Sequence, residues 1–158
     1  MTSLWLTLLV RCLLVALFLP FSALDKLLNF RAAVDQAGQT VRVPPLAALL
    51  ILIGLMTEVV MSVAILSGYA DRLAALILAA YCLVTALLWK QFWRAPDFRL
   101  QGPSRGRELF WDFLKNVALA GGFLLLTLGG DRAGVTRFWQ HPLASSHPYA
   151  AVAPGAGS

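Results

Sequence analysis

The sequence predicts an all-α protein, a four-helix transmembrane bundle followed by a disordered C-terminal tail. Of its 158 residues, 59% are hydrophobic and only 13% are charged, which is far from the balance of a soluble domain. Four apolar windows are each long enough to cross a hydrocarbon core, which takes about 20 helical residues. None of them alternates like a strand, and a bilayer admits only helices or closed barrels because backbone polar groups must be satisfied internally.

The four windows are expected at residues 4–24, 46–66, 73–89 and 110–128. The first could be mistaken for a secretory signal. It lacks a basic start, contains Arg11, and has a poor cleavage site in "FSA", so we interpret it as a membrane helix. The tryptophans all fall at or just beyond a window end, and this supports the boundaries because indoles favour the headgroup level.

These windows place a four-helix membrane domain at residues 1–130. Residues 131–158 are rich in Ala, Pro, Ser and Gly, and we expect a flexible polar tail there. The cysteines, Cys12 and Cys82, and the histidines, His141 and His147, show no spacing typical of a metal site or a redox pair. No metal is therefore expected.

Basic residues are unevenly distributed between the connections. Residues 25–45 and 90–109 hold several lysines and arginines, whereas the short turn between the second and third spans holds only Arg72. The first and third connections share one side of a four-span protein. The positive-inside bias therefore predicts loops 25–45 and 90–109 in the cytoplasm and both termini outside. This topology accounts for the net charge of +5, and so apolar a chain gives no support for nucleic-acid binding.

Loop 90–109 is the longest polar stretch between spans. It contains Pro96, Gly102, Pro103 and Gly106, which predict irregular structure until about Arg107. We expect a protein partner to dock there.

Glu58 is the only charged residue in the apolar stretch "PLAALLILIGLMTEVVMSVAILSG". A charge deep in the bilayer is costly, so Glu58 should face the bundle interior, be paired, or be protonated. Counted from the outer ends of their spans at about 1.5 Å per residue, Arg11 and Glu58 lie at similar depth. We therefore predict an Arg11–Glu58 ion pair, which the planar guanidinium favours. Such a pair either sets helix register or takes part in catalysis or transport.

A second polar cluster is expected near the cytoplasmic face. Asp25 and Lys26 end the first span and Lys90 ends the third. In the fourth span, Asp112 precedes Lys115 and Asn116 by three and four residues, so these side chains share one helix face. Snorkelling to the interface is the alternative for the terminal lysines, but it explains Lys115 less well because that residue lies a full turn inside.

In this order, these residues resemble the DoxX family of small bacterial inner-membrane proteins. "RCLLVALFLPFSALDKLLNF" is similar to the family's opening helix, "LLILIGLMTEVVMSVAILSGYADRLAALIL" to its second and third helices, and "FLKNVALAGGFLLL" to its closing helix. The resemblance covers residues 4–129. One departure is that the Gly usual before the Lys of the first helix is absent, with Ser22 and Ala23 in that region. The resemblance implies that the functional positions of the family correspond in this sequence to Arg11, Lys26, Glu58, Lys115 and Asn116.

The resemblance implies a link to redox chemistry. Some relatives are subunits of a thiosulfate:quinone oxidoreductase, and others belong to membrane complexes that manage oxidative or thiol stress. We expect an accessory subunit of such a complex. The alternatives are the catalytic small subunit of a thiosulfate:quinone-type oxidoreductase and a small proton-coupled carrier, although the spans hold no relay of further acidic residues or histidines for a carrier. No flavin, haem or metal motif is present, so a redox role would need a bound quinone or a partner.

Overall fold

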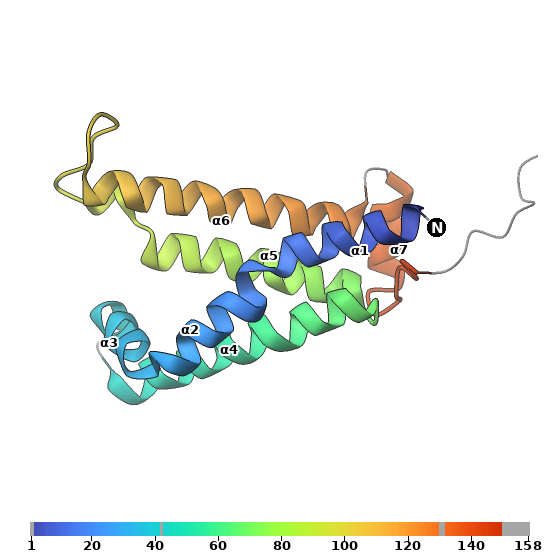
Figure 1. The fold of residues 1–158 in the computed structure, drawn as a ribbon, viewed down its shortest axis with the longest axis horizontal. Coiled ribbons are helices and arrows are strands. Elements are labelled where there is room, and N and C mark those ends of the chain that lie inside the picture. The colour runs from blue at the N-terminus through green and yellow to red at the C-terminus, as the bar shows by residue number, and fades with distance from the viewer. Residues whose placement is uncertain (1, 42, 130–131, 150–158) are drawn as a thin grey trace, which may run out of the picture.

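The computed structural model describes residues 2–41, 43–129 and 132–149, and this part of the chain is helical with no strand. Four helical stretches are long and apolar enough to cross a membrane, and they pack as a bundle (Figure 1). The all-α, four-span prediction is confirmed. The elements in chain order are α1 (Thr2–Val15), η1 (Leu17–Ser22), α2 (Ala23–Leu28), α3 (Phe30–Val41), α4 (Pro44–Ser67), α5 (Asp71–Trp89), η2 (Phe92–Arg94), α6 (Arg105–Leu128) and α7 (Arg132–Gln140).

The first span is a kinked helix made of α1, η1 and α2. Leu19 departs from helical geometry with φ −125° and ψ 114°, immediately before Pro20. Proline lacks the N–H that would continue the helical hydrogen bonds, and its ring clashes with the preceding turn. Beyond the kink, α2 runs over α4, whereas α1 packs against both α4 and α6 (Figure 1). The first span thus contacts α4 on both sides of the kink and contacts α6 through α1.

The core lies where α5 and α6 pack along each other, with the first span against them. Ala75, Ala79 and Cys82 of α5 are fully buried there together with Phe123 of α6. Small side chains let helix backbones approach closely, and close packing is a main source of helix association in lipid. Phe18, just before the kink, completes this core from the first span.

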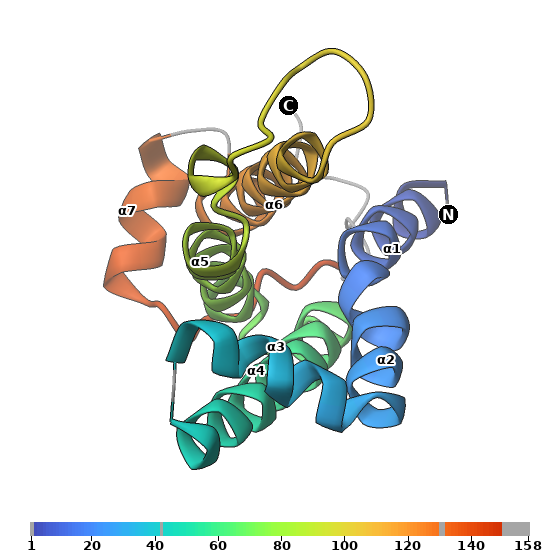
Figure 2. The same ribbon diagram turned by 90° about the vertical axis from the view of Figure 1, so that its left-hand side faces the viewer.

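Both long connections lie at one end of the bundle, as predicted for an even number of spans. The first is mostly helical, because α3 occupies residues 30–41 and packs across the end of α4 (Figure 2). The second is the loop that precedes α6. Helix α6 begins at Arg105, where Ser104 caps it by accepting a hydrogen bond from the Arg107 N–H at 3.2 Å. The start of α1 and helix α7 lie at the opposite end (Figure 1).

The expectation of a flexible tail from residue 131 needs correction for residues 132–149. Residues 132–140 form α7, whose Phe138 is buried. The following segment folds back onto the bundle, and the Tyr149 hydroxyl donates to the Leu66 carbonyl at 2.5 Å. Composition did not predict these contacts, because only a few aromatic and hydroxyl side chains attach this segment to the bundle. The rest of its composition is typical of a disordered tail. Residues 130–131 and 150–158 of the predicted tail lie outside the described residues.

Gly106 allows the loop before α6 to pack against the start of that helix. A Cβ at this position would lie 2.6 Å from Phe98 Cα and 2.9 Å from Phe98 N. We expect Gly106→Ala to lower the free energy of unfolding by about 1–3 kcal/mol, because the clash is with backbone that cannot rotate away. The measurement is thermal unfolding in detergent. Gly121→Ala on the same helix is the control: nothing lies within 4 Å of its Cβ, so it should be neutral or stabilising.

Candidate functional site

A polar cavity of about 480 Å³ lies inside the half of the bundle that carries α3. The kinked first span, α3, α4, α5 and α6 all contribute to its walls. Six of the seven polar residues selected from the sequence line it. They are Asp25, Lys26, Glu58, Asp112, Lys115 and Asn116.

Glu58 lies at the inner wall of this cavity and is only 2% exposed. Its Oε1 accepts hydrogen bonds from Lys26 Nζ at 2.5 Å, from the Tyr81 hydroxyl at 2.8 Å and from Ser22 Oγ at 3.1 Å. Its Oε2, by contrast, has no partner among the described residues. One half of the carboxylate is therefore satisfied by the protein, and the other half is free to accept.

The local fold explains why these groups meet. Ser22 and Lys26 are four residues apart across η1 and α2, so they share the helix face that the kink turns toward α4. Tyr81 reaches Glu58 from α5, and Gly54, one turn before Glu58, makes room for it. A Cβ on Gly54 would lie 3.1 Å from the Tyr81 hydroxyl oxygen.

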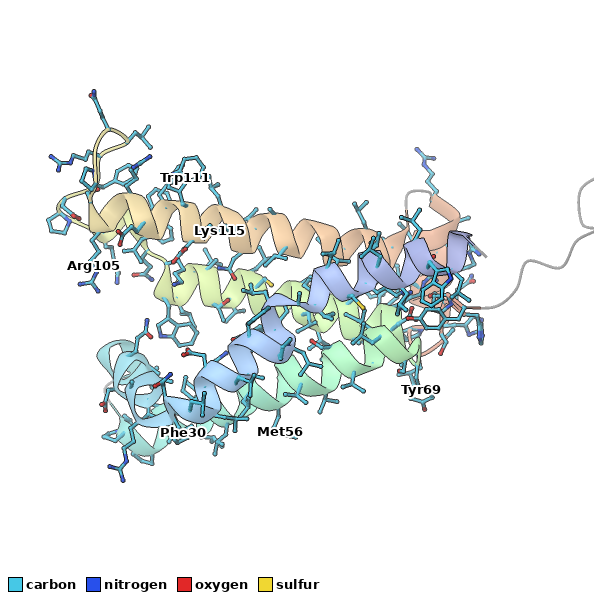
Figure 3. The ribbon with its side chains drawn as sticks, viewed as in Figure 1. Phe30, Met56, Tyr69, Arg105, Trp111 and Lys115 are labelled. Atoms are coloured by element: carbon cyan, nitrogen blue, oxygen red, sulfur yellow. The ribbon has the colours of Figure 1, made fainter. Side chains whose placement is uncertain are left out.

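A second group of charges lies nearer the end of the cavity, around Asp112. Its carboxylate binds Lys90 Nζ at 3.0 Å and Lys115 Nζ at 3.3 Å. The Asn116 amide donates to the Asp112 backbone carbonyl at 2.9 Å, so the predicted shared face is present. The Lys115 side chain is 71% exposed and lies in the same half of the bundle as α3 (Figure 3), so its ion pair is a loose one.

Asp25 and Trp89 also line the cavity. Asp25 accepts from the Asn29 amide at 2.8 Å and is exposed. The Trp89 indole N–H is buried and has no acceptor among the described residues. An unpaired buried donor carries a free-energy penalty, so the Trp89 N–H is open to an acceptor that reaches it.

The predicted Arg11–Glu58 ion pair is wrong. Arg11 instead binds Asp71 Oδ2 through Nη2 at 2.5 Å and the Ile65 carbonyl through Nη1 at 2.5 Å, while Glu58 pairs with Lys26. Helical side chains lean toward the N-terminus of their own helix. Since α1 and α4 run in opposite directions (Figure 1), Arg11 leans toward one end of the bundle and Glu58 toward the other.

Asp71 is the main residue that sequence reasoning missed. It is 0% exposed and also accepts from the Ser146 N–H at 2.9 Å and from the Ser146 hydroxyl at 2.5 Å. The expected third span started two residues later, at residue 73, which left Asp71 in a turn. One pattern could have identified Asp71. It is an acidic residue in the first turn of a span, at the same end of the bundle as Arg11.

Ser22, Tyr81 and Trp89 were also missed. For Tyr81 a pattern was available, because α4 and α5 form a hairpin around residues 68–70. Glu58 lies ten residues before that turn and Tyr81 eleven residues after it, so a hairpin of straight helices brings them to nearly the same level. Ser22 and Trp89 carried no such indication, since their roles depend on the kink and on the cavity.

The arrangement suits an uncharged polar ligand. Three lysines and three carboxylates line the cavity, so an additional ionic charge would lack a counter-ion. Among the described residues that line the cavity, the buried side-chain atoms without a hydrogen-bond partner are one acceptor, Glu58 Oε2, and one donor, Trp89 Nε1. Apolar side chains such as Leu17, Phe18 and Leu119 supply the remaining walls, as is typical of small-molecule sites.

Two comparisons relate the chain to known proteins. Residues 6–91 match the model of the DoxX family. The chain is also similar to the inner membrane protein YphA of Escherichia coli (strain K12), with 31% identity over 129 residues that cover 81% of this chain and 85% of that protein. No solved structure matches the chain significantly.

Proposed function

The chain belongs to the DoxX family, and on that premise we propose that its polar cavity binds the headgroup of a quinone. In this role the protein is an accessory subunit of a redox- or thiol-stress-related membrane complex. It is a multi-pass inner-membrane protein, so molecules dissolved in the bilayer, such as quinones, are among the ligands that it can meet.

The free groups in the cavity wall carry this proposal. A quinone carbonyl accepts a hydrogen bond, and the reduced form donates from a hydroxyl. Trp89 Nε1 can donate to the carbonyl of the quinone, and Glu58 Oε2 can accept from the hydroxyl of the reduced form. The balanced charges of the lining favour a neutral ring over an anion such as thiosulfate. Lys26 holds Glu58 in place at 2.5 Å, so the carboxylate can take up a proton without losing its orientation.

A partner protein supplies or removes the electrons in this proposal. The sequence carries no flavin, haem or metal motif, and the described residues contain no group of three or more metal-ligand side chains. The role of this chain is therefore to bind the ring, orient it and exchange a proton with it. From the basic connections we infer that the cavity end of the bundle faces the cytoplasm, where soluble partners are available.

The test is binding of a short-chain ubiquinone analogue to the purified protein in detergent, measured by titration of the melting temperature. Trp89→Phe removes only the indole N–H and should weaken binding by roughly two- to tenfold, the effect of losing one neutral hydrogen bond. Trp111→Phe is the matched control, since Trp111 is half-exposed on α6 and does not line the cavity.

Equal affinities in the two variants, or no binding by the wild-type protein, would contradict the proposal. A second arm addresses the accessory role. With thiosulfate or a small thiol supplied as the electron donor, purified protein alone should not reduce the analogue at a significant rate, whereas protein recovered with partners in mild detergent should. Reduction by the purified chain alone would instead make it the catalytic subunit.

A further inference from the structure

We propose that the connection before α6 is a binding surface for anionic phospholipid headgroups. The connection and the first turn of α6 carry four arginines, Arg94, Arg99, Arg105 and Arg107, and we call this segment the arginine shelf. The proposal concerns a different part of the molecule from the polar cavity and does not depend on what the cavity binds. The sequence marks the same loop as a docking site for a protein partner, but the structure favours lipid.

The shelf is rigid, unlike an ordinary exposed loop. Asp97 accepts the Arg105 N–H at 2.8 Å and the Gly106 N–H at 3.1 Å, which fastens the loop to the first turn of α6. Arg99 donates to the Pro103 carbonyl at 3.0 Å. A surface held in one conformation loses little entropy when it binds a ligand.

An aromatic cluster beneath the loop holds its base. The Phe92 ring lies 5.1 Å from Trp93, 5.2 Å from Phe98, 5.1 Å from Phe110 and 5.5 Å from Phe113, measured between ring centroids. Aromatic pairs at these separations attract each other beyond simple burial. The positions of the arginines are thus set by packing that does not involve a ligand.

The charge of the shelf is uncompensated. Residues 90–109 carry five basic and two acidic side chains. Asp97 is occupied by backbone N–H groups, and Lys90 pairs with Asp112. None of the four shelf arginines forms an ion pair within the described part of the chain. Guanidinium groups bind phosphate oxygens in a planar, two-bond geometry, so the missing counter-ions are phosphates.

The position of the loop indicates that these phosphates belong to lipids. The loop extends sideways past α6, beyond the outline of the helices (Figure 2), so it overlies the lipid next to the bundle. Trp93 and Trp111 beside it are 50% and 49% exposed, and Arg105 and Trp111 lie on the same end of α6 (Figure 3). Exposed indoles favour the headgroup level of a bilayer, where polybasic segments attract anionic lipids.

The experiment is native mass spectrometry of the full chain in detergent with phosphatidylglycerol or with phosphatidylcholine of the same acyl chains. The variant carries Arg94→Gln, Arg99→Gln, Arg105→Gln and Arg107→Gln. Wild-type protein should prefer phosphatidylglycerol, and the variant should bind it at least about tenfold more weakly, because each cation near an anionic surface contributes to the attraction. Unchanged affinity for phosphatidylcholine and unchanged circular dichroism would show that the variant is folded.

The matched control replaces two exposed arginines at the opposite end of the bundle, Arg132→Gln and Arg137→Gln on α7. This control should bind phosphatidylglycerol like the wild type. Equal loss in both variants, or no loss in the shelf variant, overturns the proposal. Displacement of the lipid by millimolar inorganic phosphate overturns it in favour of a free-phosphate site. Loss of a co-purified acidic protein without loss of lipid overturns it in favour of protein docking.

Discussion

Arg11→Met is expected to lower the free energy of unfolding by about 3–5 kcal/mol, the effect of removing one partner from a buried ion pair. The side chains of Arg11 and Asp71 are 4% and 0% exposed. Without the guanidinium, the Asp71 carboxylate keeps its bonds to Ser146 but loses its only ion-pair partner in the described part of the chain. The measurement is unfolding in mixed detergent micelles, followed by circular dichroism.

Two controls separate buried charge from lost packing. The double variant Arg11→Met with Asp71→Asn removes both charges and keeps an acceptor for Ser146, so it should recover much of the loss. Lys115→Met breaks an ion pair whose lysine is 71% exposed and should change stability by less than about 1 kcal/mol. An Arg11→Met variant as stable as Lys115→Met would show that the Arg11–Asp71 pair contributes little.

Glu58→Gln is expected to weaken binding of the ubiquinone analogue by roughly 10- to 150-fold, since a hydrogen bond to a charged group contributes about 1.5–3 kcal/mol. The amide is the same size and can still accept from Tyr81 and Ser22 through its oxygen. It cannot take up a proton, and it places a second donor where Oε2 now offers an acceptor. Titration of the melting temperature with the analogue measures the effect.

Asp25→Asn is the control for Glu58→Gln. It makes the same change of charge in another residue that lines the cavity, but Asp25 is exposed and bonded to Asn29, so affinity should change less than about twofold. Similar affinities in the two variants would refute the assigned role of Glu58. Loss of folding in Glu58→Gln, with Asp25→Asn intact, would mean that the Lys26–Glu58 pair sets helix register instead.

The two buried acidic groups have different surroundings. At the end with α7, Arg11, Asp71 and Ser146 bond to one another and fasten the chain after α7 to the helices. In the other half, Glu58 keeps a free oxygen and borders a cavity. The first arrangement is typical of a structural lock and the second of a binding site.

Much of the candidate site was predictable from polar residues in apolar surroundings. Lipid penalises unpaired charge, so Glu58 was expected to face the bundle interior, and the helix spacing predicted that Asp112, Lys115 and Asn116 share one face. Their pairing was harder to predict. Counting residues placed Arg11 level with Glu58, but it took no account of the direction in which the two side chains lean. The acidic residue opposite Arg11 belonged to a helix that was expected to start two residues later.

The sequence by itself determined the helical class, the four spans and their approximate ends, because the bilayer requires about 20 apolar residues per helix and internally satisfied backbone groups. Only the tertiary structure decided which charges meet, where the cavity lies and how residues 132–149 pack. These depend on the direction of the chain after Pro20 and on the lean of each side chain, and both arise from packing between segments that are distant in the sequence.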